Sequence, residues 1–530
     1  MSMMSTMSMI DDIKTIAELS GIVSARYGSK VALIVGGRQT TYHELDRRTT
    51  RIAHALIRHG VDPRERIAIL AKDPLVCMQL VMGAAKANAV SVPINWRLTA
   101  GEIAHILDDA QTRLFLVGEE FGPMLAKVAE ASVHAPETVV IPTDGAREPL
   151  GAWSEGAPDA LPPLHHDPED VVVQLYTSGT TGHPKGVQLP NRSFFALAQQ
   201  MEACGDPWIG WTAGSVSLLF VPLFHIGGLW WLVRGLALGS TNVVLPGFEP
   251  AAILLAISEY RVNKTCMVPA MAQVLLNEPG CQTTDFSSLE TIVYGGSPIA
   301  TPVLRRAMEV FGCDFCQIYG MTETGNMAVC LRPDDHRGAD DRRLRAAGRP
   351  LPGVDVRILG RDGQPVDDGA AGEIVIKSLA RMKGYWNVPD SAEVEAADGW
   401  IKTGDVGYKD EDGFIHVCDR VKDMIISAGE NIYPAEIENV IRGHREVADV
   451  AVIGVPDDLW GEAVKALIVR APGSAIRARD LIQHTRAHLA EFKIPKSIEF
   501  VDQLPRNASG KILKARLGEP YWAGRQRRVN

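Results

Sequence analysis

The sequence is poor in cysteine: only 8 of its 530 residues are of this type, and they are scattered along the chain. A disulfide framework needs closely spaced pairs in a short secreted sequence, so this class of protein is excluded. Cys313 and Cys316 form a lone CxxC within an apparent strand. A zinc site would need a second pair or histidines at ligand spacing, and neither follows. We therefore interpret these two cysteines as buried thiols.

Positive charge is also scarce. Lysine and arginine number 54 against 64 acidic residues, which gives a formal net charge of −10. A nucleic-acid-binding protein usually presents a basic surface, and the one basic cluster of this sequence, at residues 525–528, is interpreted as a solvated tail. Nucleic acid is therefore not expected as a partner.

The sequence shows neither a secretory leader nor a long uninterrupted apolar run. Residues 1–10 are rich in Met and Ser and precede two acidic residues, so no signal peptide is predicted and a cytoplasmic location is expected. The most apolar stretch, residues 215–238, contains Pro222, His225 and Arg234. A membrane span tolerates few such residues, so we predict a buried strand, loop and helix instead. Peripheral membrane contact stays open.

Short apolar runs alternate with amphipathic stretches through the first half of the chain. This alternation predicts an α/β fold with parallel sheets covered by helices. The same rhythm recurs from residue 171 to residue 317, so two similar α/β subdomains are expected. The runs assigned to the first of them are residues 31–35, 66–70, 90–94, 114–117 and 139–141, with helical patterns at 42–59 and 74–87.

Beyond about residue 348 the pattern changes. Alternating runs separated by Gly/Asp turns predict an antiparallel β subdomain. A small α+β unit follows, with helices predicted from Pro434 and over residues 478–492. We therefore expect a large N-terminal domain, residues 1–419, and a small mobile C-terminal domain, residues 420–530.

A loop rich in glycine and hydroxyl groups carries the strongest functional signal. It follows the apolar run 171–175 and ends in a lysine. Glycine leaves backbone N–H groups open to an anion, hydroxyls add donors and the lysine adds a positive charge, so the loop suits a polyphosphate. It is not a Walker A loop, because no Gly-Lys-Ser/Thr sequence follows a glycine at the spacing that such a loop requires. The candidate phosphate-binding residues are Thr177, Ser178, Gly179, Thr180, Thr181, Gly182 and Lys185.

This loop resembles the phosphate loop of the adenylate-forming superfamily, which includes acyl-CoA synthetases, firefly-type luciferases and the adenylation domains of peptide synthetases. Five further motifs resemble those of the family and follow in the family's order. They are YGMTE at 319–323, TGD at 403–405, DRVKD at 419–423, SAGENIYP at 427–434 and PRNASGK at 505–511. The first 170 residues fit the family's first α/β subdomain.

The resemblance implies a two-step reaction that uses ATP, Mg²⁺ and coenzyme A. A carboxylate first attacks the α-phosphorus of ATP and releases pyrophosphate, and a thiol then displaces AMP. A carboxylic acid:CoA ligase is the leading interpretation. We expect a fatty acid of medium to long chain as substrate, with aryl or hydroxycinnamic acids as the second choice.

Within that scheme the resemblance assigns roles on the nucleotide side. Lys511 would stabilise the charge that develops on phosphorus, because fixed charges in a dry site are more effective than water. Thr322 would bind a phosphate oxygen and Glu323 would bind Mg²⁺. Asp405 and Arg420 would hold the ribose. The adenine would lie between Tyr319 and a glycine wall, and the nucleotide-binding set comprises Gly295, Gly296, Ser297, Gln317, Tyr319, Gly320 and Met321.

The remaining roles concern the acid and the thiol. His225 matches the family's acyl-site aromatic position and is expected to orient the carboxylate or gate the pocket. Gly227 and Gly228 are expected to leave space for an open, apolar acyl tunnel, which Trp231 would line unless it belongs to the core. The resemblance assigns the hinge to Lys422, the pantetheine passage to Gly429 and a coenzyme A contact to Trp460. Ile494 stands where some aryl-CoA ligases have a basic residue, so coenzyme A phosphate binding there stays open.

Alternatives remain at this point. An acyl-AMP ligase that loads a carrier protein shares these motifs, although no inserted segment is evident near residues 350–420. The adenylation motifs also do not distinguish a luciferase-like oxygenase. An inactive nucleotide-binding or membrane-peripheral module would be expected to lack Lys511 or Glu323, and both are present. Small molecules are the expected partners, and a homodimer is compatible with the sequence.

Overall fold

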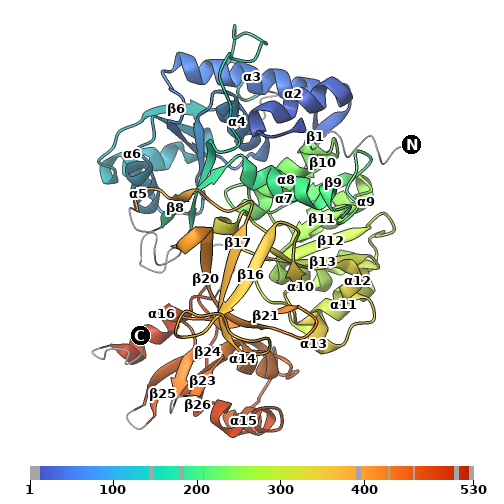
Figure 1. Cartoon of the computed structure of the whole chain (residues 1–530), viewed down its shortest axis with the longest axis vertical. Helices are drawn as coiled ribbons and strands as arrows, with labels where there is room; N and C mark the ends of the chain where they lie inside the picture. The colour runs from blue at the N-terminus through green and yellow to red at the C-terminus, as the bar shows by residue number, and fades with distance from the viewer. Residues whose placement is uncertain are drawn as a thin grey trace.

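The computed structural model of the protein describes residues 12–142, 148–177, 184–206, 208–388, 395–427, 430–457, 460–506 and 512–523. Figure 1 shows the N-terminal α/β layers at one end of an elongated molecule and the C-terminal elements at the other, with antiparallel strands between them. The predicted α/β class, with a large N-terminal domain and a small C-terminal one, is confirmed. The residue at which the two meet stays a prediction.

The first sheet has seven strands in the order β18-β8-β7-β4-β3-β5-β6. Its central strands pair in parallel, and their residues are buried almost throughout, as expected for a sheet covered on both faces. The strands are β3 (Arg66–Leu70), β4 (Val90–Pro93), β5 (Leu114–Gly118), β6 (Glu137–Ile141), β7 (Val171–Thr177), β8 (Lys185–Pro190) and β18 (Gly384–Tyr385). The helices of this region are α2 (Ile16–Tyr27), α3 (Tyr42–Arg58), α4 (Pro74–Lys86), α5 (Ala100–Ala110) and α6 (Gly122–Ala131).

The second sheet has nine strands in the order β15-β14-β13-β12-β11-β9-β10-β1-β2. Its strands are β1 (Val31–Val35), β2 (Arg38–Thr41), β9 (Val216–Leu219), β10 (Thr241–Val244), β11 (Lys264–Met267), β12 (Thr291–Gly295), β13 (Asp314–Tyr319), β14 (Val329–Leu331) and β15 (Arg349–Pro350). Its helices are α7 (Arg192–Ala203), α8 (Ile226–Ala237), α9 (Pro250–Glu259), α10 (Pro269–Asn277), α11 (Thr301–Phe311), α12 (Pro333–His336) and α13 (Asp341–Leu344).

Two assignments of strands to subdomains were wrong. The run that starts at Val171 was counted with the second subdomain, but β7 pairs in parallel with β4 of the first sheet, with Val173 opposite Ser91. The run Val31–Val35 was counted with the first subdomain, but β1 pairs in parallel with β10 of the second sheet, with Leu33 opposite Asn242. An apolar run identifies a buried strand, whereas its partner is set by tertiary packing that the run does not encode. The N-terminal hairpin therefore joins the two subdomains.

The strongly apolar stretch 215–238 is folded as predicted. It forms strand β9, a loop and helix α8, and the buried Arg234 on that helix pairs with Glu202 at 3.4 Å. Among the described residues, no helix combines the length and the apolar character that crossing a membrane would need.

The antiparallel subdomain consists of β16 (Val354–Leu359), β17 (Gly372–Ser378), β19 (Glu395–Ala396), β20 (Trp400–Lys409) and β21 (Ile415–Arg420). Its strands pair in antiparallel fashion, which confirms the change of pattern seen in the sequence. Gly363, between the first two strands, has a φ of +75°, a left-handed turn conformation that suits glycine.

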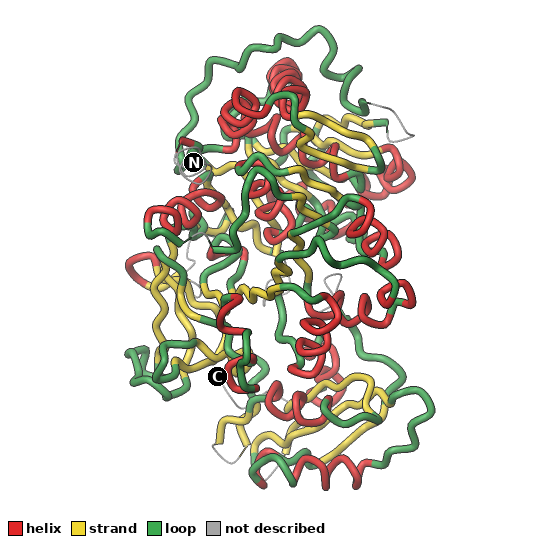
Figure 2. Tube along the Cα trace, turned by 90° about the vertical axis from the view of Figure 1, so that its right-hand side faces the viewer, coloured by secondary structure: helices red, strands yellow, loops and turns green. Residues whose placement is uncertain are grey.

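The C-terminal elements form a separate sheet with helices beside it, visible at the lower end of Figure 2. The strands are β22 (Ile425–Ser427), β23 (Glu430–Ile432), β24 (Val447–Asp457), β25 (Gly461–Arg470) and β26 (Ser497–Phe500). The helices are α14 (Pro434–Arg442), α15 (Ala478–Arg486) and α16 (Lys514–Trp522). Helix α15 ends at Arg486, before the predicted residue 492, and residues Glu491–Lys493 form a separate 3-10 turn in which Phe492 is 46% exposed.

Candidate active site

Three of the predicted nucleotide-binding residues meet around Asp405, which is only 7% exposed. The Tyr319 hydroxyl donates to Asp405 Oδ2 at 2.7 Å, and Arg420 Nε lies 2.8 Å from Oδ1. These residues come from β13, β20 and β21, which belong to two different sheets. The carboxylate is thus held between an aromatic hydroxyl and a guanidinium, at the place where a ribose was expected.

The TGD motif acquires its shape from local backbone constraints. Gly404 has a φ of +68°, which favours glycine, and the Asp405 N–H donates to Thr403 Oγ1 at 3.0 Å. The Thr403 hydroxyl in turn donates to Ile374 O at 2.8 Å. The Val421 N–H donates to Gly404 O at 2.8 Å, so the same turn also holds the start of the predicted hinge.

The predicted glycine wall lies at the carboxyl end of β12. A Cβ at position 295 would lie 2.5 Å from the carbonyl oxygen of Ile318, so close strand packing requires glycine there. Gly296 has a φ of +82° and is exposed, as is Ser297. On the neighbouring strand β13, Gln317 is partly buried and pairs with Tyr294. This leaves an open backbone surface next to the strand that ends in Tyr319.

The YGMTE segment forms a tight turn after β13. A Cβ at Gly320 would lie 2.4 Å from the carbonyl oxygen of Asn326. Met321 and Thr322 are partly buried, whereas Glu323 is only 5% exposed. Burial raises the pKa of Glu323, and a hydrogen bond from the Tyr385 hydroxyl, 2.7 Å from Oε1, acts in the opposite direction. The positive charges of Arg420 and Lys185 also lower this pKa.

The two ends of the phosphate loop are held together by the β7–β8 hairpin. Thr177 and Lys185 are paired across its last register position. Lys185 Nζ lies 5.4 Å from the centre of the Tyr385 ring, so the lysine and Glu323 contact the same tyrosine. The loop residues Ser178, Gly179, Thr180, Thr181 and Gly182 lie outside the described residues.

Sequence reasoning missed the segment that carries this tyrosine. Strand β18 pairs with β8, with Tyr385 opposite Val187, so it lies along the base of the phosphate loop. The next residue, Trp386, stacks under the Arg66 guanidinium at 3.3 Å and donates from Nε1 to Asp109 O at 2.8 Å. Two adjacent aromatics after a glycine were the available signal, but their partners are distant in sequence.

The metal expectation can be tested against the side chains present. Among the described residues, no group of three or more His, Cys, Asp or Glu side chains could enclose a metal ion. Mg²⁺ commonly binds through one or two carboxylates and completes its shell with substrate phosphates and water. A single buried carboxylate, Glu323, near Lys185 therefore fits a magnesium ion that arrives with ATP.

On the acyl side, His225 immediately precedes helix α8. Burial and the positive charge of Arg97 lower its pKa to about 4, so the imidazole is neutral near pH 7. Its ring contacts that of Phe224, with 4.7 Å between centres. A neutral histidine can donate or accept a hydrogen bond without repelling or neutralising a carboxylate.

The other three predicted acyl residues have different surroundings. A Cβ at Gly227 would meet only Asn326 Oδ1, at 3.7 Å, so this position has room for a side chain. A Cβ at Gly228 would lie 2.4 Å from the carbonyl oxygen of Pro222, which makes glycine a packing requirement. Trp231 is buried in the core, where its Nε1 donates to Ser217 Oγ at 2.8 Å. The structure therefore explains Gly228 and Trp231 by packing.

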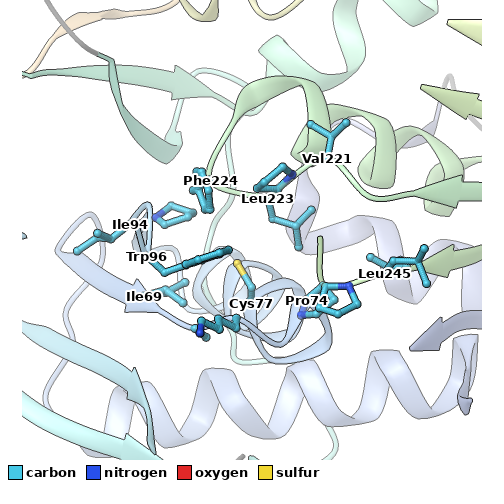
Figure 3. Close-up of a pocket in the computed structure, with 15 residues that line it drawn as sticks. Ile69, Pro74, Cys77, Ile94, Trp96, Val221, Leu223, Phe224 and Leu245 are labelled. Carbon is cyan, nitrogen blue, oxygen red and sulfur yellow. The ribbon is translucent and has the colours of Figure 1, made fainter. Parts of the chain in front are cut away.

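Figure 3 shows a crevice between the two α/β subdomains, with side chains from both pointing toward a common space. Apolar side chains and Lys72 line it, and its free volume is about 20 Å³. It is lined by residues at the carboxyl ends of β3, β4, β9 and β10, among them Ile69, Ile94, Leu245 and Phe224. Trp96, also in the lining, stacks with Arg97 at 4.1 Å. Because Phe224 is part of the wall, the crevice adjoins His225.

Two of the predicted residues of the small domain, Lys422 and Trp460, are exposed. Lys422 is exposed in the turn after β21, and Trp460 is 43% exposed, with Lys496 Nζ 6.0 Å from its ring centre. Ile494 is 5% exposed, so it belongs to the interior. Gly429 and the predicted catalytic Lys511 lie outside the described residues.

The residues on either side of the Lys511 segment are well anchored. Arg506 forms a β-bridge with Ile512 and an ion pair with Asp449. Lys514 Nζ lies 2.9 Å from Glu438 Oε1. These contacts tie both flanks of residues 507–511 to the body of the small domain.

A contact of β21 with helix α14 joins the antiparallel subdomain to the small domain. Asp419 Oδ2 accepts the Ala435 N–H at 2.7 Å. The Ala435 N–H is one of the first-turn groups that have no partner within their own helix. Burial raises the pKa of Asp419 to about 6, while the nearby Lys514 charge acts against this shift.

Comparison with known proteins agrees with these features. Residues 22–386 match the family model described as AMP-binding enzyme, and residues 436–511 match the AMP-binding enzyme C-terminal domain. The first match covers more than half of the chain. The chain therefore belongs to the AMP-binding enzyme family of adenylate-forming proteins, and it is an AMP-forming ligase.

Individual relatives show which kinds of ligase the chain is similar to. The chain is 43% identical over 519 residues, 98% of each chain, to the fatty acid–[acyl-carrier-protein] ligase ScoC of Streptomyces coeruleorubidus. It is 38% identical to the feruloyl-CoA synthase of an Amycolatopsis species, over 90% of this chain and 93% of the relative. Among solved structures, ATP-bound MatB from Rhodopseudomonas palustris matches with a TM-score of 0.86 and 29% identity, covering 96% of this chain and all of the other.

Proposed function

We propose that the protein joins a fatty acid of medium to long chain to the thiol of coenzyme A at the expense of ATP. The observation that carries this proposal is the Tyr319–Asp405–Arg420 cluster next to the buried Glu323. The Asp405 carboxylate can bind ribose hydroxyls, and the Glu323 carboxylate can bind a cation. Together they match the two ends of a magnesium-bound nucleotide. The adjoining apolar crevice and His225 supply the surroundings for the acid.

In the first step an oxygen of the substrate carboxylate bonds to the α-phosphorus, and the bond from that phosphorus to the bridging oxygen breaks. Pyrophosphate leaves, and a mixed anhydride of the acid with AMP remains. Lys185 and Lys511 supply positive charge to the phosphates, and Thr322 donates from its hydroxyl. Mg²⁺, when bound, would neutralise charge on the departing phosphates, and Glu323 would hold it.

In the second step the thiol sulfur bonds to the carbonyl carbon, AMP leaves, and the thiol proton passes to solvent. The neutral His225 orients the carbonyl group in both steps. The proposed division at residues 419 and 420 lets the small domain turn about Lys422 between the steps. Such a rotation would exchange the Lys511 segment for Gly429, and Trp460 would then contact the nucleotide part of coenzyme A.

A carrier protein is a second candidate acceptor. The 43% identical relative is named for the transfer of a fatty acid to an acyl carrier protein. Ile494, which replaces a basic residue at a coenzyme A contact of some relatives, is buried and offers no charge to a nucleotide phosphate. Coenzyme A and a carrier protein present the same phosphopantetheine thiol, so the chemistry of the second step is unchanged.

One local feature supports the choice of acid. A Cβ at Gly227 would meet only Asn326 Oδ1, at 3.7 Å, and this room favours a flexible aliphatic chain. The relationship to a feruloyl-CoA synthase makes an aryl acid the alternative substrate.

The test is a matrix of acids and acceptors. Straight-chain acids of increasing length, ferulate and benzoate are each incubated with ATP and Mg²⁺, and pyrophosphate and AMP are quantified with coenzyme A, with a phosphopantetheinylated carrier protein or with neither. Thioester formation with long-chain acids and coenzyme A supports the proposal. Thioester on the carrier protein alone supports the second acceptor, and pyrophosphate release with ferulate alone contradicts the fatty-acid assignment. Failure of every acid to release pyrophosphate contradicts the proposed function.

A further inference from the structure

We propose that Tyr385 is a positioning residue that holds the Glu323 carboxylate and the Lys185 ammonium on the phosphate side of the active site. This inference rests on the proposed function, because it takes Glu323 as the residue that binds the magnesium ion of ATP. Tyr385 belongs to none of the motifs that the sequence offered, and it lies more than 60 positions from Glu323.

The contacts of Tyr385 join two charges of opposite sign. Its hydroxyl donates to Glu323 Oε1 at 2.7 Å, and its ring centre lies 5.4 Å from Lys185 Nζ. A carboxylate that accepts one hydrogen bond keeps a second oxygen with which to bind a cation. An ammonium group over a ring face is attracted by the ring without losing its charge. The two functional groups of tyrosine therefore serve two different partners.

The backbone around Tyr385 makes this placement rigid. The residue pairs with Val187 in β8, and the Met382 N–H donates to Glu323 O at 2.8 Å. On the other side, the Trp386 N–H donates to Gly186 O at 2.8 Å, and the Trp386 ring is covered by Arg66. The Tyr385 side chain thus projects from a segment fixed to the base of the phosphate loop and to the Glu323 turn.

A purely structural role makes a different prediction. A buried hydrogen bond that only stabilises the fold would, when lost, lower the melting temperature without changing metal affinity selectively. A positioning role predicts selective loss of metal affinity, since partners of metal-binding groups typically contribute about 10- to 100-fold. Tyr385→Phe separates the two, because it keeps the ring over Lys185 and removes only the hydroxyl.

The matched control is Tyr521→Phe. The Tyr521 hydroxyl also donates to a glutamate, Glu499 Oε2, at 2.6 Å, and Lys465 Nζ lies 4.7 Å from its ring centre, but Tyr521 belongs to helix α16, outside the predicted phosphate site. The full-length wild type and each variant are titrated with Mn²⁺ in the presence of saturating α,β-methylene ATP, and free Mn²⁺ is followed by electron paramagnetic resonance. Binding of the same nucleotide without metal and the melting temperature are measured in parallel.

We expect Tyr385→Phe to weaken Mn²⁺ binding by about 10-fold or more, with metal-free nucleotide affinity unchanged within twofold. The control should match the wild type. Adding Tyr385→Phe to Glu323→Gln should produce little further loss, since the hydroxyl acts through that carboxylate. Tyr385→His, which retains a ring donor, should restore part of the affinity and provides a second test if the phenylalanine variant does not fold.

Wild-type Mn²⁺ affinity in Tyr385→Phe would overturn the inference, as would an equal loss of metal-free nucleotide binding. Full additivity with Glu323→Gln would overturn it too. Each of these outcomes leaves the proposed function intact as long as the wild type forms acyl-AMP. If the wild type forms no acyl-AMP with any acid, the proposed function itself fails.

Discussion

The predicted nucleotide half and the predicted acyl half of the candidate active site are built on different principles. On the nucleotide side, polar side chains from separate sheets hold one another, as Tyr319, Asp405 and Arg420 do. On the acyl side, the predicted residues are glycines and packed apolar groups around a single histidine. Mutual hydrogen bonds fix the first geometry before any ligand arrives. The geometry of the acyl side depends instead on the positions that lack a side chain.

This difference predicts how each half tolerates change. Removing one member of a polar cluster leaves its partners uncompensated in a partly dry site, so the loss is large and specific for ATP. On the acyl side, a larger side chain fits where there is open space and clashes where there is none. It therefore changes either the preferred length of the acid or the stability of the protein. A change in one half that altered the function of the other would break this contrast.

Lys511→Ala should slow pyrophosphate release by roughly 10²- to 10³-fold, because a fixed cation would be lost from the charge that develops on phosphorus. Preformed acyl-AMP should still react with coenzyme A at close to the wild-type rate, since that step no longer involves the phosphate charge. Single-turnover measurements of the two half-reactions check this. Comparable losses in both would show that the lysine does not act on the nucleotide half alone.

Asp405→Asn should raise the KM for ATP by roughly 10- to 100-fold. Charge-assisted hydrogen bonds contribute about 1.5–3 kcal/mol each, and the substitution removes the charge that Arg420 and Tyr319 now contact. The KM for the acid should change less than twofold in steady-state assays. Asp412→Asn, in the exposed turn of the same hairpin, is the control and should leave both constants unchanged. An equal rise in both KM values would remove the distinction between the halves.

Gly228→Ala should lower the free energy of unfolding by about 1–3 kcal/mol, because its new Cβ would overlap the carbonyl oxygen of Pro222. Urea denaturation measures this loss. The ratio of activities on long and short acids should not change. A change of chain-length preference at constant stability would instead show that Gly228 lines the acyl pocket.

Gly227→Leu should leave stability close to that of the wild type and shift the preferred acid toward shorter chains. The position has open space beside Asn326, so the added side chain projects into the region where the acid is proposed to bind. The selectivity lost for the longest acid should correspond to roughly 1–3 kcal/mol in kcat/KM. If all chain lengths are affected equally, the chain runs elsewhere.

The last prediction concerns the pH dependence of stability. The pKa of His225 is lowered to about 4 in the folded protein, compared with about 6.5 for an unperturbed histidine. Above pH 6.5 both states are neutral at this site, so it contributes no pH dependence. As the pH falls from 6.5 toward 4, the unfolded state takes up the proton first, and stability declines by about 3 kcal/mol.

His225→Gln should flatten that part of the stability profile. Urea midpoints measured between pH 7 and pH 4.5 for the wild type and the variant provide the comparison. Parallel profiles would mean that the imidazole is as easily protonated in the folded protein as in the unfolded chain.

The sequence predicted local elements well and long-range partners less well. Runs such as Val31–Val35 and Val354–Leu359 are strands with those same limits, because strand character is encoded in neighbouring residues. The pairing of β1 with β10 was not predictable, since either sheet could accept an apolar strand. The end of helix α15 was predicted wrongly for a related reason. Hydrophobic periodicity does not reveal which apolar side chains pack against another element.

The candidate site shows the same division. The motifs named Asp405, Tyr319 and Arg420, and the structure places them in mutual contact. Tyr385 was missed because its relationship to Glu323 arises from the pairing of β18 with β8, which no local pattern specifies. For Trp231 the sequence left two places open, the acyl tunnel and the core, because a tryptophan on an apolar helix suits either, and the structure packs it in the core.

The contact of Asp419 with helix α14 has a consequence for recombining this protein with its relatives. The acceptor is a specific side chain on the large part, whereas the donor is a backbone N–H that a helix start offers whatever its sequence. A foreign small domain grafted after residue 420 therefore finds its acceptor already in place. In the reverse graft, residues 1–420 come from a relative that has no acidic residue at position 419. The start of helix α14 then lacks the acceptor that Asp419 provides.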